Sequence, residues 1–178
     1  KISEATVDTI NEGVEINGKR VAPASDLNEF FRVGGNGKFV YEAEVRHFLD
    51  LLTTNEKYPF STPTLRDELR HTFWLVGNRV NSAKAMEKLL RRHPVFSQYK
   101  IVLAAGDGKS LSDDDEVTEE MQDAARNKRS IEKVRQAIAK HDKTITLSVG
   151  QLTTGVTIKE WSAVLMLSDI KQETLYTQ

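Results

Sequence analysis

The sequence predicts an α/β domain with a parallel sheet over residues 71–178, preceded by a mostly helical segment over residues 1–70. A continuous apolar run at Thr72–Val76, bounded by Gly77, is typical of a strand that is buried on both faces of a parallel sheet. Similar runs alternate with stretches of helical periodicity, in the order β-α-β, insertion, α-β, loop, β. This alternation indicates right-handed crossovers, with helices on both faces of the sheet.

The spacing of apolar residues and the positions of glycine and proline predict the helices and strands of residues 71–178. The helix expected after the first strand has Ala83, Met86 and Leu89 on one face, and Pro94 closes it. The expected strands are 72–76, 99–105, 144–149 and 161–167, and the expected helices are 80–92 and 130–141. The region can therefore form a doubly wound sheet.

The acidic stretch Ser110–Glu120 interrupts this pattern and contains the run Asp113–Glu116. Its carboxylates lack the regular spacing of a metal-binding loop. We therefore expect a solvated, mobile insertion and no metal site.

Residues 1–70 contain weaker signals. Asn17-Gly18 is a strong hairpin turn signal within 14–21, Asp26 can cap a short helix over 26–31, and Gly34–Gly37 is typical of a flexible turn. A helix is expected over 41–52, and a short helix that Thr62 or Thr64 caps runs to Leu69. Core or interdomain contacts are expected from the aromatic residues Phe30, Phe31, Tyr41, Phe48, Tyr58 and Phe60. The segment is either an appendage or a linker between domains.

Composition narrows the class of protein. The chain has 178 residues, a formal net charge of −1 and no cysteine, which excludes disulfides and thiolate metal sites and suits a reducing cytoplasm. No apolar run reaches the ~18 residues of a membrane helix. Basic clusters at 91–93 and 126–129 are interpreted as solvated faces, because no general basic field accompanies them.

Several catalytic signatures are absent from the sequence. It has no Walker-type phosphate loop, no Gly-x-Gly-x-x-Gly and no Gly-x-Ser-x-Gly, and its four histidines are scattered. The residues therefore give no support to a catalytic triad or a zinc reaction. The best candidate is Ser148–Thr157, where hydroxyls and glycines follow an apolar strand. From the residues alone, this segment is either a phosphate-binding loop or a plain turn between strands.

A resemblance to a known family favours the phosphate-binding loop over the plain turn. Four segments carry it, in this order along the chain: His71–Val80, Ala83–Leu90 with His93-Pro94, Ile145–Val156 and Tyr176–Gln178. They resemble the motif IV strand and loop, the following helix, motif V and the opening of motif VI of the second RecA-like domain of superfamily 2 helicases and translocases. The resemblance is strongest to the motor subunits of restriction–modification enzymes of the type I, type III and fused single-chain kinds. It covers residues 71–178, and motif V is its most specific part.

The resemblance implies a set of contacts to nucleic acid. Thr153 and Thr154 would contact a backbone phosphate of double-stranded DNA, and Gly155 would allow the close approach. Asn78 and Arg79, at the tip of the first strand, would make further backbone contacts, which position a strand without reading its sequence.

The resemblance also implies a nucleotide site shared with another domain. Gly155 and Thr157 would lie near the ribose of ATP, although many relatives have an acidic residue in place of Thr157. The arginines of motif VI would follow Gln178, and the first RecA-like domain would supply the Walker loop and the Mg²⁺-binding motif. We therefore expect an excised fragment that needs ATP and Mg²⁺ only within an intact parent and has no catalytic residue or cofactor of its own.

Three function classes follow from the sequence. The first is the motor fragment of a cytoplasmic restriction–modification translocase, with methyltransferase or specificity subunits as further partners and no membrane. The second is a stand-alone α/β module that binds protein or nucleic acid, and the third is a nucleotide or sugar-phosphate transferase. Flanking sequence would discriminate between the first two, and ligand-induced thermal stabilisation would support the third.

Overall fold

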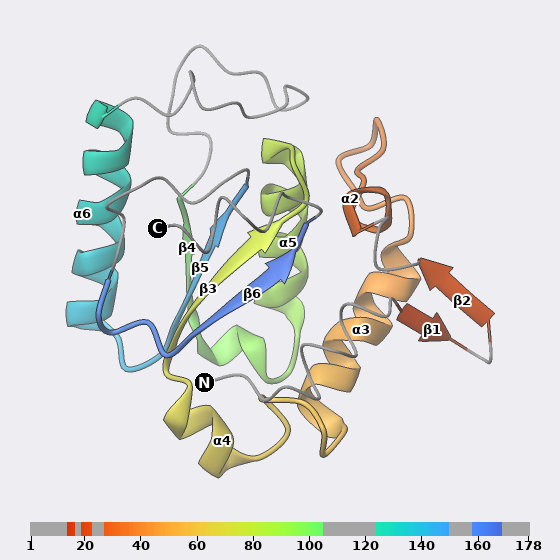
Figure 1. The fold of residues 1–178 in the computed structure, drawn as a ribbon, viewed down its shortest axis with the longest axis horizontal. Helices are drawn as coiled ribbons and strands as arrows, with labels where there is room; N and C mark the ends of the chain where they lie inside the picture. The colour runs from red at the N-terminus through yellow and green to blue at the C-terminus, as the bar shows by residue number, and fades with distance from the viewer. Residues whose placement is uncertain (1–13, 17–18, 23–26, 105–123, 150–157, 169–178) are drawn as a thin grey trace.

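The computed structural model describes residues 14–16, 19–22, 27–104, 124–149 and 158–168 (Figure 1). Its elements, in chain order, are β1 (Val14–Ile16), β2 (Lys19–Ala22), α2 (Leu27–Phe30), α3 (Glu42–Thr54), α4 (Pro63–Glu68), β3 (His71–Val76), α5 (Val80–Arg92), the 3-10 helix η2 (Phe96–Gln98), β4 (Lys100–Leu103), α6 (Ala124–Lys140), β5 (Thr144–Ser148) and β6 (Ala163–Leu167).

Strands β3 to β6 form a four-stranded sheet in the order β4-β5-β3-β6, and every pair in it is parallel. The first strand of this sheet along the chain, β3, therefore lies inside the sheet between β5 and β6. Every β3 position after His71 is buried, because helices cover both faces of the sheet there. This burial explains why the sequence of β3 is continuously apolar. The predicted parallel α/β sheet is confirmed.

Helices cover both faces of the sheet, as predicted, with α5 on one side and α6 on the other (Figure 1). Successive side chains of β4 point to opposite faces of the sheet, so this strand contributes to the core on both sides. Ile101 belongs to the core under α5, whereas its neighbour Val102 packs with Val134 and Ala137 of α6.

The N-terminal segment packs on the α5 side and shares its hydrophobic core. Phe60 lies 5.9 Å from Trp74 of β3 and 5.2 Å from Phe96, measured between ring centroids. Of the aromatic residues expected in the core, all but the half-buried Tyr41 are buried. The core therefore crosses residue 70, the predicted boundary between the helical segment and the sheet domain.

The short elements agree with their local signals. The predicted hairpin appears as the antiparallel pair β1 and β2. Thr62 caps α4, since its side-chain oxygen accepts a hydrogen bond from the Leu65 N–H at 3.2 Å. Asp26 and Asp113–Glu116 lie outside the described residues, so the Asp26 cap and the mobile insertion stay predictions.

Element boundaries differ from the sequence prediction by at most two residues, except that the start of α6 differs by six. Helix α6 begins at Ala124, six residues before the predicted start, because residues 124–129 are mostly good helix formers although the apolar periodicity starts only at Ile131. Strand β6 begins at Ala163, since Trp161 closes a turn by donating its N–H to the Ile158 carbonyl at 3.1 Å. No described helix combines the length and apolarity that a bilayer span requires.

Candidate functional site at the carboxyl edge of the sheet

The carboxyl ends of β3, β5 and β6 meet at one edge of the sheet. Leu75 pairs with Ser148 of β5, and Val76 pairs with Leu167 of β6. The Gly77 N–H extends this ladder by donating to the Leu167 carbonyl at 2.9 Å. The last described residues of these strands therefore lie side by side, at the edge where open α/β sheets bind ligands.

Gly77 turns the chain sharply between β3 and α5. Its φ is +62°, a conformation that side chains other than glycine rarely adopt, and an added Cβ would lie 2.9 Å from the Ser82 Oγ. The turn places Asn78 half-buried and Arg79 exposed, directly before the first turn of α5. These are two of the residues predicted to contact nucleic acid.

A contact from the N-terminal segment braces this turn. The Ser82 hydroxyl, in the first turn of α5, donates a buried hydrogen bond of 2.8 Å to the Phe31 carbonyl. Phe31 follows α2 and is itself 1% exposed. The loop that carries Asn78 and Arg79 is thus held from two sides, by β6 and by the N-terminal segment.

A buried polar atom lies near the same edge. The Ser168 Oγ, just past β6, is buried and has no hydrogen-bond partner among the described residues. An unsatisfied buried polar group costs about 1–3 kcal/mol. The Ser168 hydroxyl is therefore suited to form a hydrogen bond with a ligand.

Helix α6 secures the end of β4 at this edge. The Lys133 ammonium donates to the Leu103 carbonyl at 2.9 Å, and the Ser130 hydroxyl donates to the Ala104 carbonyl at 3.4 Å. A lysine charge thus stands beside the carboxyl edge. The edge combines cations, an amide and hydroxyls, which suits the binding of phosphate oxygens.

The remaining predicted site residues cannot be placed at this edge by their own coordinates. Thr153, Thr154, Gly155 and Thr157 lie outside the described residues. The segment that contains them follows Val149, the residue after Ser148 at the end of β5.

Two groups with shifted pKa values, His71 and Tyr99, lie at the opposite, amino edge of the sheet. Partial burial, and next the charge of Arg70, lower the pKa of His71 at the start of β3. Burial raises the pKa of Tyr99, just before β4, to about 12. No group of three metal-ligating side chains occurs within the described ranges. Neither His71 nor Tyr99 lies at the carboxyl edge.

Sequence reasoning missed one histidine contact and the brace at Ser82. His93 is one of four histidines scattered along the sequence, yet its Nε2 lies 3.0 Å from the Asp50 Oδ1 of α3. Neither this pair nor the Ser82–Phe31 hydrogen bond has a local signal, because their partners are 43 and 51 residues apart.

Comparison with known proteins gives one informative relative. The chain is 27% identical over 150 residues to a Mycoplasma pneumoniae protein described as the C-terminus of a candidate type II restriction enzyme and methyltransferase. The match covers 79% of this chain and 19% of that protein, so the chain spans about a fifth of the relative's length. No family model and no solved structure matches the chain. The similarity supports a relation to restriction–modification enzymes.

Proposed function

We propose that this chain is the second RecA-like domain of an ATP-dependent DNA translocase in a restriction–modification system. The observation that carries the proposal is the position of Asn78 and Arg79 at the carboxyl edge, beside the end of the strand that leads into Thr153 and Thr154. The parallel sheet covered on both faces is compatible with a RecA-like domain. The restriction-enzyme relative supports the biological context.

The proposed task of the edge is to hold the DNA backbone. Arg79 supplies a charged donor, Asn78 an amide, and Thr153 and Thr154 supply hydroxyls, while Gly155 admits the phosphate closely. The brace from Ser82 to Phe31 fixes the direction in which the Asn78–Arg79 turn faces. These contacts would position double-stranded DNA without reading its sequence.

The proposed nucleotide site is completed by another domain. The described edge has hydrogen-bonding groups but no lysine-bearing phosphate loop, so Gly155 and Thr157 would contact only one side of the nucleotide. The phosphoryl-transfer chemistry would come from ATP and Mg²⁺ bound between this domain and the first RecA-like domain. Methyltransferase or specificity subunits are the further partners that this function implies.

Replacement of Arg79 tests the DNA contact directly. In the intact enzyme, Arg79→Gln should weaken DNA binding about equally for all sequences and reduce the slope of log K against log salt by about 1, because one phosphate contact is lost. Arg91→Gln is the matched control, since Arg91 lies at the far end of α5 and pairs with Glu87. Equal salt slopes for Arg79→Gln and the control would refute the contact.

Replacement of the two threonines tests the motor assignment. Thr153→Ala with Thr154→Ala in the intact enzyme should lower DNA-stimulated ATP hydrolysis, while hydrolysis without DNA changes little. ATPase assays with and without DNA measure this difference. Unchanged stimulation would exclude the motor and leave a stand-alone binding module.

A further inference from the structure

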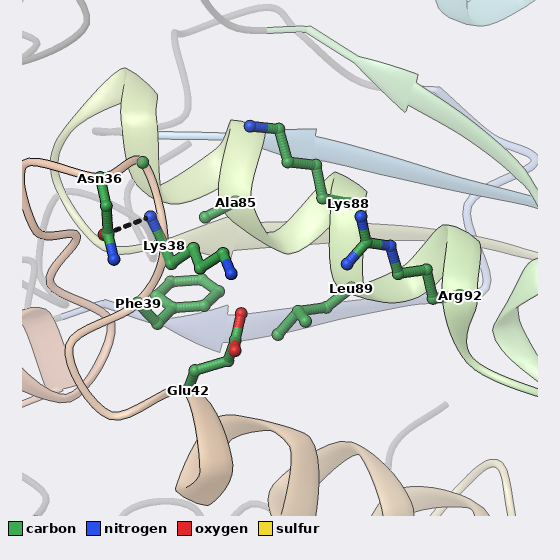
Figure 2. Close-up of a pocket in the computed structure, with 9 residues that line it drawn as sticks. Asn36, Lys38, Phe39, Glu42, Ala85, Lys88, Leu89 and Arg92 are labelled. Carbon is green, nitrogen blue, oxygen red and sulfur yellow. Dashed lines mark hydrogen bonds between the residues drawn. The ribbon is translucent and has the colours of Figure 1, made fainter.

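A second polar site lies away from the carboxyl edge, between residues 36–42 and the later turns of α5 (Figure 2). It is an open cavity of about 180 Å³. Phe39, Ala85 and Leu89 form its apolar floor, and each of them is buried. Charged side chains surround this floor, which distinguishes the cavity from an ordinary packing defect.

Three cations line this pocket, and they come from two parts of the chain. Lys88 and Arg92 stand four residues apart on α5, so they lie on the same face of the helix. Lys38 reaches the pocket from the turn before α3. Figure 2 shows Lys38 pointing across the floor and Arg92 lying over Leu89.

The turn at Gly37 brings the two parts together. Gly37 has a φ of +77°, and the Asn36 Oδ1 accepts a hydrogen bond from the Lys38 N–H at 3.0 Å. A Cβ added to Gly37 would lie 3.9 Å from the Lys88 Nζ, so the Lys88 ammonium packs against this turn. The cations are therefore held near one another by the fold, against their mutual repulsion.

The charges of this pocket are not balanced. Within the described part of the chain, no carboxylate lies within ion-pair distance of Lys38, Lys88 or Arg92, whereas the neighbouring Arg91 pairs with Glu87 at 3.0 Å. Glu42 contributes one carboxylate to the lining. Three cations and one anion leave a formal charge of +2.

We propose that this pocket binds a single phosphate group. Its volume is well below the ~300–1,000 Å³ of pockets for whole small molecules, so it admits one compact group. A phosphate monoester carries about −1.5 to −2 charges, which matches the excess, whereas a carboxylate would neutralise only half of it. Phe39 is 4% exposed and cannot stack on a base, so the pocket recognises the phosphate and not the nucleobase.

Titration with inorganic phosphate tests the pocket without any assumption about the Asn78–Arg79 edge. Calorimetry at constant ionic strength, with potassium chloride as the reference salt, should show saturable phosphate binding to the wild-type protein. Lys88→Gln and Arg92→Gln should each weaken it about tenfold, because each removes a charge-assisted hydrogen bond. Glu42→Gln should strengthen binding, since it removes the repelling carboxylate.

Arg91→Gln is the control for this titration. Arg91 is adjacent to Arg92 on α5, is exposed and forms a salt bridge with Glu87. Its replacement should therefore leave phosphate affinity unchanged. The exposed positions of Lys88 and Arg92 keep the variants folded. Equal phosphate affinity in the wild type and Arg92→Gln, or equal loss in Arg91→Gln and Arg92→Gln, would overturn the proposal.

Two sources can supply the phosphate, and an oligonucleotide distinguishes them. A single strand with a 5′-phosphate should bind more tightly than the same strand with a 5′-hydroxyl if the group belongs to a DNA end, and Arg92→Gln should abolish that preference. Saturable inorganic phosphate binding without a 5′-phosphate preference assigns the pocket to free phosphate or a free phosphate ester. Both results support a phosphate pocket, whereas absence of both responses overturns it.

Discussion

The two faces of the sheet are built differently. Under α5, rings from the N-terminal segment and from the sheet region contact one another, with Phe60, Trp74 and Phe96 at centroid distances of 5.2–5.9 Å. Under α6, the buried cluster of described residues is small and aliphatic; it contains Val102, Val134, Ala137 and Ile158, and Trp161 packs against it. Among the described residues, the core under α5 is therefore the larger one.

The face under α6 also carries polar groups. By alternation along β3 and β5, His71, Thr144 and Thr146 point away from the α5 core. The His71 Nδ1 lies 3.0 Å from the Thr144 Oγ1, and the buried Thr146 Oγ1 has no partner among the described residues. The comparison shows that the N-terminal segment completes one face of the sheet domain, and this same segment braces the Asn78–Arg79 turn.

The largest expected effect is on the α5 face. Phe60→Ala should lower the free energy of unfolding by about 3–5 kcal/mol, because it removes a fully buried ring that contacts Trp74, Phe96 and Tyr99. Val134→Ala on the α6 face should cost about 1–2 kcal/mol, as two buried carbons are lost. Urea denaturation measures both. Equal losses would show that the two faces contribute alike.

A smaller effect is expected where α3 meets the end of α5. The His93 Nδ1 accepts hydrogen bonds from the N–H groups of Val95 at 3.1 Å and Phe96 at 3.4 Å, so its proton lies on Nε2 and is donated to Asp50. His93→Ala leaves these buried groups unsatisfied and should cost about 1–3 kcal/mol.

Asp50→Ala is the matched variant for this pair. The Asp50 side chain is 64% exposed, against 8% for His93, so the hydrogen bond from the His93 Nε2 to Asp50 should itself contribute at most about 1 kcal/mol. Thermal or chemical denaturation of the two variants compares them. A larger loss for Asp50→Ala would mean that the pair, and not the backbone contacts of His93, fastens α3 to α5.

Local signals made much of the fold predictable. Helix α5 has the predicted bounds Val80–Arg92 because Gly77 and Pro94 punctuate it, and Thr62 caps α4 because it precedes Pro63. Contacts between distant segments were not predictable. His93 is buried because α3 packs against the end of α5. The apolar periodicity of the sequence does not predict where α3 packs, so it does not predict the burial of His93.

The candidate site was predictable only in part, for the same reason. Asn78 and Arg79 became candidates through the resemblance to helicase motif IV, and the structure places them at the carboxyl edge. Their brace at Ser82 depends on a carbonyl 51 residues earlier. Likewise, Lys38 and Arg92 are unremarkable surface cations in the sequence, and only the turn at Gly37 brings Lys38 to α5.

The smallest expected effect is a pH dependence on the α6 face. Burial and the charge of Arg70 lower the pKa of His71 in the folded protein below its ordinary value of 6.5. The unfolded chain therefore binds the proton at a higher pH than the folded chain, so stability is unaffected above about pH 7 and falls as the pH drops through 6.5. His71→Gln should flatten this decline in denaturation curves between pH 8 and pH 5. In the wild type, His71 forms a hydrogen bond with Thr144. His71→Gln should therefore match the wild-type free energy of unfolding at pH 8 only if the glutamine amide forms the same hydrogen bond. An unchanged slope below pH 6.5 would show that the polar groups of the α6 face do not set its response to acid.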